Sequence, residues 1–159
     1  MREPGLSSIL EFFDQISLPY QFASLPMDTF LPGIQIENGV LLVDLGRLSH
    51  VGDLLHEAGH IAVTSGAERH QLCGNVDAIG EKGGEEMAAI AWSWAALTQL
   101  GLPPEVVFHP EGYRGGSANY IEGFRQHGGF GHPLLSYFGM CLPYGEIGGF
   151  PVMTRWLRG

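Results

Sequence analysis

Positive charge is scarce in this sequence. Only 8 of its 159 residues are lysine or arginine, against 17 aspartates and glutamates, which gives a formal net charge of -9. The basic residues are scattered, whereas proteins that bind nucleic acids or anionic membranes carry theirs in patches or stripes. We therefore expect neither a nucleic acid nor a membrane among the partners of this protein.

Long apolar runs and cysteines are also few. The most apolar stretch, residues 87–97, is too short to cross a bilayer. The first residues lack the apolar run and the small-residue cleavage site of a secretory signal. The two cysteines, Cys73 and Cys141, lie far apart in the sequence. We therefore expect reduced thiols and a cytoplasmic protein, rather than a disulfide.

The composition is typical of one globular domain. Hydrophobic residues make up 45% of the chain and charged residues 16%, and a chain of this length can bury a substantial core. We expect a single domain over residues 1–159 with a glycine-rich C-terminal third, about 105–159. Within that third, short helices are predicted at 117–126, 133–142 and 151–157.

Near the N-terminus, apolar residues recur at helical spacing over residues 9–16, and Ser7 or Ser8 can cap the predicted helix. Prolines 19, 26 and 32 then break the chain into extended or turning segments.

A β-hairpin is predicted directly after these prolines. The β-rich runs 34–37 and 40–44 flank the pair Asn38-Gly39. Both residue types tolerate the positive φ of a type I′ turn, which makes the pair a strong hairpin signal.

Two longer helices are predicted in the middle of the chain. Apolar residues recur every three or four positions from about 49 to 64, with Ser49 as the N-cap and Gly66 as the stop. A polar loop over about 67–84 follows. The second helix runs from about 84 to 100, with acidic residues in its first turn, where they favour the helix dipole.

The first of these helices contains the sequence His56-Glu57-Ala58-Gly59-His60. Residues four apart lie on one helix face about 6 Å apart, so both imidazoles can reach one Zn2+ at roughly 2.0–2.1 Å. Glu57 is placed to take a proton from a metal-bound water whose pKa the ion lowers to about 7. The small Gly59 would let another element or a substrate approach closely.

A catalytic zinc site needs a third protein ligand and one open position. Glu86 is the preferred third ligand, because it shares a helix face with residues that look directed to the core, and Glu85 is the alternate. Both could instead cap the dipole of the helix and face water. Asp77 and Glu81 are weaker candidates, because a loop would position them less firmly.

Other histidines and tyrosines could polarise a carbonyl or hold an oxyanion, although no spacing supports any one of them. They are His70, His109, Tyr113, Tyr120, His127 and His132. A surface or satisfied core side chain is the simpler interpretation for each. Trp92 and Trp94 are expected in the core.

Over roughly residues 33–101 the chain resembles the ImmA/IrrE-like family of small metallopeptidases. The shared order is a hairpin, an H-E-x-x-H helix and, about 26 residues later, a helix that begins with glutamate. In that family an Ala follows the third ligand after three residues, and an aromatic residue comes next; Glu86, Ala89 and Trp92 fit this order. The resemblance implies that the motif's histidines and Glu86 bind the metal, that its glutamate is the general base, and that the protein is cytoplasmic with relatives that often cleave transcriptional repressors. Family members often carry Asn or Asp where this chain has Ile90, and the glycine-rich third has no counterpart.

We therefore expect an α+β, zincin-like fold in which a small antiparallel sheet packs on the two helices. The expected function is that of a zinc-dependent metallopeptidase of gluzincin type, acting on a peptide or protein substrate such as a regulatory protein. The alternative is a non-catalytic zinc-binding regulatory or interaction module, whose closed four-ligand site would recruit Cys73, His70 or His132. A hydrolase of non-peptide amides is a third, weaker interpretation.

Overall fold

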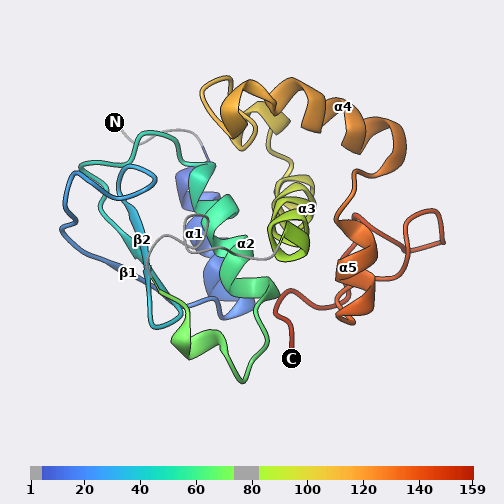
Figure 1. Ribbon diagram of the computed structural model, residues 1–159, viewed down its shortest axis with the longest axis horizontal. Coiled ribbons are helices and arrows are strands. Elements are labelled where there is room, and N and C mark those ends of the chain that lie inside the picture. The colour runs from blue at the N-terminus through green and yellow to red at the C-terminus, as the bar shows by residue number, and fades with distance from the viewer. Residues whose placement is uncertain (1–4, 74–82) are drawn as a thin grey trace.

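A small β-sheet, a central pair of helices and a loop-rich C-terminal region lie in that order across the molecule (Figure 1). The computed structural model describes residues 5–73 and 83–159. Its mixture of a sheet and several helices confirms the α+β class. Buried apolar side chains from all three parts form one cluster, so the parts share a core.

The predicted hairpin is confirmed. Strands β2 (Ile34–Glu37) and β3 (Val40–Val43) pair antiparallel. Asn38 and Gly39 form the turn with φ angles of 53° and 77°, a region that these two residue types enter more readily than others. Alternate residues bury one face of the hairpin: Ile34, Ile36, Leu41 and Val43.

A third strand, β1 (Tyr20–Phe22), makes the sheet mixed rather than antiparallel. It pairs with β3 in parallel, and the strand order is β1-β3-β2. The antiparallel expectation is wrong at this edge, because the segment between β1 and β2 crosses to the far edge before the hairpin turns back beside β1. Pro19 directly precedes β1, which is why the pattern indicated only extended or turning chain.

Helix α1 (Leu6–Ile16) begins before the serines expected to cap it. Gly5 is the N-cap residue and no side chain bonds the helix end, so the prediction of Ser7 or Ser8 is wrong. Leu6 is already buried, and the apolar face of the helix therefore sets its first residue rather than a polar cap.

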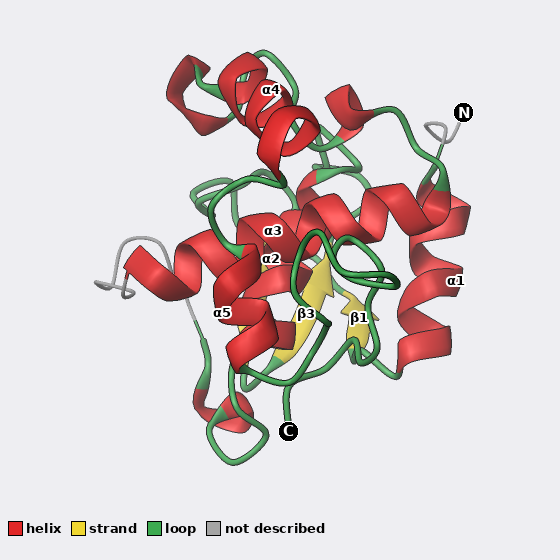
Figure 2. Cartoon of the chain, turned by 90° about the vertical axis from the view of Figure 1, so that its right-hand side faces the viewer, coloured by secondary structure: helices red, strands yellow, loops and turns green. Residues whose placement is uncertain are grey.

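Helices α2 (Asp53–Val63) and α3 (Gly83–Leu100) pack against each other between the sheet and helix α5 (His132–Tyr137) (Figures 1 and 2). Both helices lie close to their predicted positions. Within residues 5–73 and 83–159, no helix is both long and apolar enough to cross a membrane.

The ends of α2 differ from the prediction. Gly52, without a side-chain cap, precedes the helix, and Ser49 lies outside it because a turn intervenes. The helix ends at Val63, where Thr64 adopts an extended conformation, so Gly66 is not its stop.

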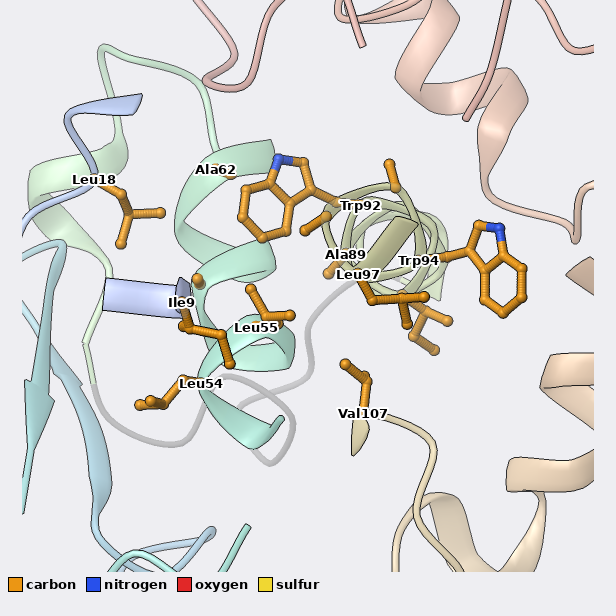
Figure 3. Close-up of a cluster of buried hydrophobic side chains, with 14 of the residues drawn as sticks. Ile9, Leu18, Leu54, Leu55, Ala62, Ala89, Trp92, Trp94, Leu97 and Val107 are labelled. Carbon is orange, nitrogen blue, oxygen red and sulfur yellow. The ribbon is translucent and has the colours of Figure 1, made fainter. Parts of the chain in front are cut away.

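Trp92 and Trp94 lie on opposite sides of α3, and their expected burial is confirmed (Figure 3). Trp92 packs against Phe12 and Trp156, with ring centroids 6.1 and 5.6 Å away. Trp94 stacks on Phe124 at 4.7 Å and an interplanar angle of 7°. Replacing a buried tryptophan by alanine typically costs about 3–5 kcal/mol, so α3 is anchored on both sides.

The C-terminal third contains α4 (Ser117–His127), α5 and two 3-10 turns, η2 (Pro104–Val106) and η3 (Tyr113–Gly115). Another 3-10 turn, η1 (Arg69–Gln71), lies in the loop after α2. The predicted helix at 117–126 is confirmed as α4.

The other two helix predictions in this third are wrong in extent or in kind. Helix α5 ends at Tyr137 rather than near 142. Residues 151–157 form no helix, because their backbone groups bond elsewhere: the N–H groups of Thr154 and Arg155 both donate to the Met140 carbonyl, at 2.9 and 3.1 Å.

Candidate metal centre

Helix α2 carries His56 and His60 on one face. Their ring centroids lie 5.2 Å apart, with the ring planes inclined at 65°. Both side chains are buried, and His60 is only 1% exposed. The two imidazoles therefore face the protein interior rather than solvent.

Helix α3 brings a carboxylate to this pair. Glu86 Oε1 lies 3.7 Å from His56 Nε2, and Glu86 Oε2 lies 3.1 Å from His60 Nε2. One potential ligand atom from each residue falls within a group no wider than 4.8 Å. Two ligand atoms on a tetrahedral ion at 2.0–2.1 Å are roughly 3.3 Å apart. His56, His60 and Glu86 could therefore hold one metal ion.

A close approach of the two helices makes this convergence geometrically feasible. A Cβ atom placed on Gly59 would lie 2.7 Å from the Ala89 carbonyl oxygen, inside the contact limit. Only glycine therefore fits between the histidines at this crossing. The suggestion that Gly59 admits another element is confirmed, and that element is α3, three residues beyond Glu86.

The ring of His56 is held from its other side. Its Nδ1 lies 2.7 Å from the Tyr113 hydroxyl of η3. When Nδ1 carries the hydrogen, it donates to Tyr113 and leaves the lone pair of Nε2 directed at Glu86 and the candidate site. Metal-binding histidines commonly use their second nitrogen in this way, because the bond fixes both tautomer and ring orientation.

Tyr113 is itself partly buried. Burial raises the pKa of Tyr113 well above 10.0, and the charges of Asp53 and Glu86 act in the same direction, against a smaller opposing effect of a hydrogen bond with Ser93. The phenol therefore stays protonated. Ser93 itself donates to the Ile90 carbonyl of α3 at 2.7 Å. Tyr113 adopts a φ of 55°, uncommon for an aromatic residue and often found at functional sites.

Glu57 is buried beside His56, with 7% of its surface exposed. A carboxylate is costly to bury unless neighbouring groups stabilise it. Its position in the motif, directly after one candidate ligand and three residues before the other, keeps it on the helix that carries both.

A cavity of about 800 Å³, here called the metal-side cavity, reaches this site. His56 and Glu86 line it from the two helices, and Tyr113 and Tyr120 line it from the C-terminal third. Residues 30–32 also contribute to its lining, and Phe30 among them is 55% exposed. The candidate ligands are thus adjacent to a space that a ligand can enter.

A second polar cluster lines the metal-side cavity. Asp53 Oδ1 accepts a hydrogen bond from His109 Nε2 at 2.8 Å, and both residues are buried. The ring of His50 stacks on that of His109 at 3.7 Å, and His50 Nε2 lies 3.2 Å from the Glu111 carboxylate. Burial raises the pKa of Asp53, while His109 and His50 oppose the rise. The Asp53–His109 bond joins α2 to the loop that leads to Tyr113.

The structure also places the remaining candidates. Glu85 is not part of the donor group at the site. His70 and Cys73 are exposed, on and after η1. His132 packs between Tyr144 and Phe150, with ring centroids 5.2 and 5.5 Å away. Among the residues described, none of these joins the three donors as a fourth metal ligand.

The other residues named from the sequence lie away from the site or outside the described residues. His127 is exposed and packs near Phe130. Asp77 and Glu81 lie outside the described residues. Cys73 and Cys141 are both free, the first exposed and the second buried.

Sequence reasoning did not find the roles of Asp53, Ser93 and Tyr113. The sequence pattern did not single out Asp53 or Ser93. Tyr113 was one of six candidates without a supporting spacing. Each acquires its role through a contact with a residue far away in the chain, for which a single sequence offers no periodic signal.

No family model matches the chain, and comparisons with curated proteins and with solved structures find no significant match. The resemblance to the ImmA/IrrE-like family therefore stays a prediction that depends on the motif residues.

Proposed function

We propose that this protein is a zinc-dependent metallopeptidase with a zincin-like arrangement of α2 and α3. The observation that carries the proposal is the convergence of one potential ligand atom each from His56, His60 and Glu86 within 4.8 Å of one another. Two imidazoles and one carboxylate are a ligand set of catalytic zinc sites, which keep a further position open.

The surroundings support a catalytic interpretation over a structural one. Structural zinc sites are closed by four protein ligands, whereas the described residues supply three. His56 and Glu86 also line a cavity of about 800 Å³, within the range of small-molecule and substrate sites. A closed structural site would not need such a space.

When bound, the ion would supply Lewis acidity, polarising a peptide carbonyl and lowering the pKa of a water. The chain's own residues then have separate tasks. Glu57 takes the proton from the attacking water and returns it to the departing amine, as a general base and then a general acid. Tyr113 holds the His56 ring in the orientation that keeps Nε2 on the site.

The substrate in this proposal is a peptide or an exposed segment of a protein. The resemblance to the ImmA/IrrE-like family favours a regulatory protein as the substrate and a cytoplasmic location. The acidic net charge of -9 and the scattered basic residues give no support to a nucleic-acid substrate.

The test compares wild type with Glu57→Gln in metal content and peptide cleavage. We expect about one zinc per chain in both proteins by elemental analysis. Wild type should cleave an unfolded protein or a mixed peptide library, and Glu57→Gln should lose at least about 10²-fold in rate because proton transfer fails. Glu11→Gln, an exposed change on α1, is the matched control and should behave as wild type. A fully active Glu57→Gln protein would exclude the proposed role.

A second function deserves a direct test, because the 3.1 Å approach of Glu86 to His60 would also suit an ion pair with a protonated histidine. In that case the cluster is a metal-free part of an interaction module. Wild-type protein purified without chelator and refilled with zinc separates the two: stoichiometric binding supports the enzyme, and failure to hold a divalent ion supports the module.

A further inference from the structure

A second, apolar cavity adjoins the candidate metal centre. It measures about 400 Å³ and shares Ile90, Tyr113 and Tyr120 with the metal-side cavity. These three residues therefore form a common wall. Ile90 follows Glu86 by four residues on α3, so the second cavity begins one helical turn from the proposed third ligand.

The lining of this apolar cavity is uncharged. Its other large side chains are Met87, Phe124 and Phe130, and glycines and Asn119 complete it. None of the described residues that line it is acidic or basic, although the chain as a whole has a net charge of -9. Such a lining accepts an apolar group and penalises a charged one, which would lose its hydration without gaining a partner.

Glycines give the cavity its width. Gly116, Gly123 and the pair Asn119-Tyr120 recur at three- and four-residue spacing at the start of α4 and along it, so one face of that helix forms the floor. Gly123 has no side chain to fill the space in front of it: a Cβ there would meet only His127, at 3.6 Å. Gly123 lines the cavity, and its vacant Cβ position is not part of a tight helix contact.

We propose that this apolar cavity receives a large apolar side chain of the substrate, from one of the two residues that flank the cleaved bond. The inference rests on the proposed peptidase function, since it assigns a side chain of the same substrate. The preferred substrates are then peptides with Leu, Ile, Met or Phe next to the bond, and peptides with Asp, Glu or Lys there are rejected.

The experiment narrows the apolar cavity by adding a side chain on α4, which forms its floor. Gly123→Leu adds bulk at the vacant position, and the change from glycine to leucine also favours the helical conformation. Ala118→Leu, on the exposed part of the same helix, adds a similar side chain away from the cavity and is the matched control. Cleavage of a peptide library by the zinc-loaded proteins, read by mass spectrometry, gives the residue preference on each side of the bond.

We expect wild type and Ala118→Leu to share a preference for large apolar residues at one position. Gly123→Leu should lose at least about tenfold in kcat/KM for Phe at that position while retaining cleavage next to Ala, because hydrophobic pockets discriminate by roughly 10- to 200-fold per methylene. Gly123→Ala, a smaller change, should give an intermediate loss and covers the case in which the leucine variant does not fold.

A binding measurement that needs no turnover separates this inference from the proposed function. N-acetyl-phenylalaninamide, tested by ligand-observed NMR, should bind wild type and Ala118→Leu and bind Gly123→Leu much more weakly. If wild type cleaves peptides but its preference is the same in Gly123→Leu, the assignment of the cavity is wrong and the peptidase proposal stands. If no peptide is cleaved and no metal is held, the proposed function fails first, and the amide measurement alone then decides whether the cavity takes apolar groups.

Discussion

The pair of helices α2 and α3 and the glycine-rich C-terminal third contribute to the same site in different ways. The helices provide His56, His60 and Glu86, whose backbones are fixed by internal hydrogen bonds and a buried interface. The C-terminal third provides Tyr113 and the walls of both cavities. The comparison indicates that regular, buried elements set the candidate ligands, while loops set what surrounds and orients them.

The C-terminal third is held by a different set of contacts. Besides bonds within this third, its last residues bond to α2 and α3: Arg158 N–H donates to the Ala62 carbonyl at 2.9 Å, and Trp92 Nε1 donates to the Trp156 carbonyl at 2.9 Å. The guanidinium of Arg158 also donates to the Val63 carbonyl at 3.1 Å, satisfying a carbonyl at the end of α2. These bonds fasten the end of the C-terminal third to the helix pair.

The largest expected effect comes from replacing a candidate ligand on the helix pair. Glu86→Gln should weaken zinc binding by more than the roughly 10- to 100-fold that loss of an outer-shell partner costs, because it removes a charged ligand. Glu85→Gln, its neighbour on α3, should leave the zinc affinity within about twofold of wild type because Glu85 is not part of the donor group, whereas losing a residue that orients a ligand costs roughly 10- to 100-fold. Competition with a chromogenic zinc chelator measures both dissociation constants.

If both variants lose zinc affinity to the same extent, the first turn of α3 acts through its total charge rather than through one ligand. If only Glu85→Gln loses zinc, Glu85 rather than Glu86 would be the third ligand. Either result would remove the claim that a regular helix selects one of two adjacent carboxylates.

The regular part of this molecule could be predicted from the sequence because its signals are periodic. The apolar spacing around His56 and the acidic start of α3 located both helices, and Asn38-Gly39 located the hairpin. Helix periodicity also favoured Glu86, which is the carboxylate found beside the histidines. The cap of α2 was misplaced, because Gly52 and a preceding turn begin the helix without any polar cap.

The rest of the site could not be predicted, since its contacts join distant parts of the chain through irregular backbone. Tyr113 reaches His56 across 57 positions, from a 3-10 turn with a positive φ that no sequence pattern announces. Residues 151–157 have apolar spacing typical of a helix, yet their N–H groups bond to Met140 instead. The parallel pairing of β1 with β3 likewise depends on how a loop crosses the sheet.

A smaller effect is expected from the bond that joins the two regions. Asp53→Ala should lower the free energy of unfolding by about 1–3 kcal/mol, because it leaves the buried His109 Nε2 without its acceptor. Glu111→Ala removes the carboxylate beside His50, but Glu111 is 80% exposed, and exposed pairs contribute about 0–1 kcal/mol. Urea unfolding followed by tryptophan fluorescence measures both. If the free energy of unfolding falls by a similar amount in the two variants, the buried Asp53–His109 bond does not anchor the loop to α2.

The smallest expected effect is on zinc affinity when the Tyr113 hydroxyl is removed. It distinguishes a residue that orients a metal ligand from a residue that binds the metal. Tyr113→Phe keeps the partly buried ring but removes the hydroxyl that bonds His56 Nδ1 at 2.7 Å. Zinc affinity should therefore fall roughly tenfold, the lower end of the range for residues that hydrogen-bond to a metal ligand. Tyr120→Phe is the matched control: its ring lies 5.2 Å from that of Tyr113 and lines the same cavities, so its zinc affinity should match wild type. The chelator competition used for Glu86→Gln measures these dissociation constants as well. If Tyr113→Phe binds zinc as tightly as wild type, the C-terminal third shapes the cavities without orienting a ligand, and the helix pair alone would account for the metal centre.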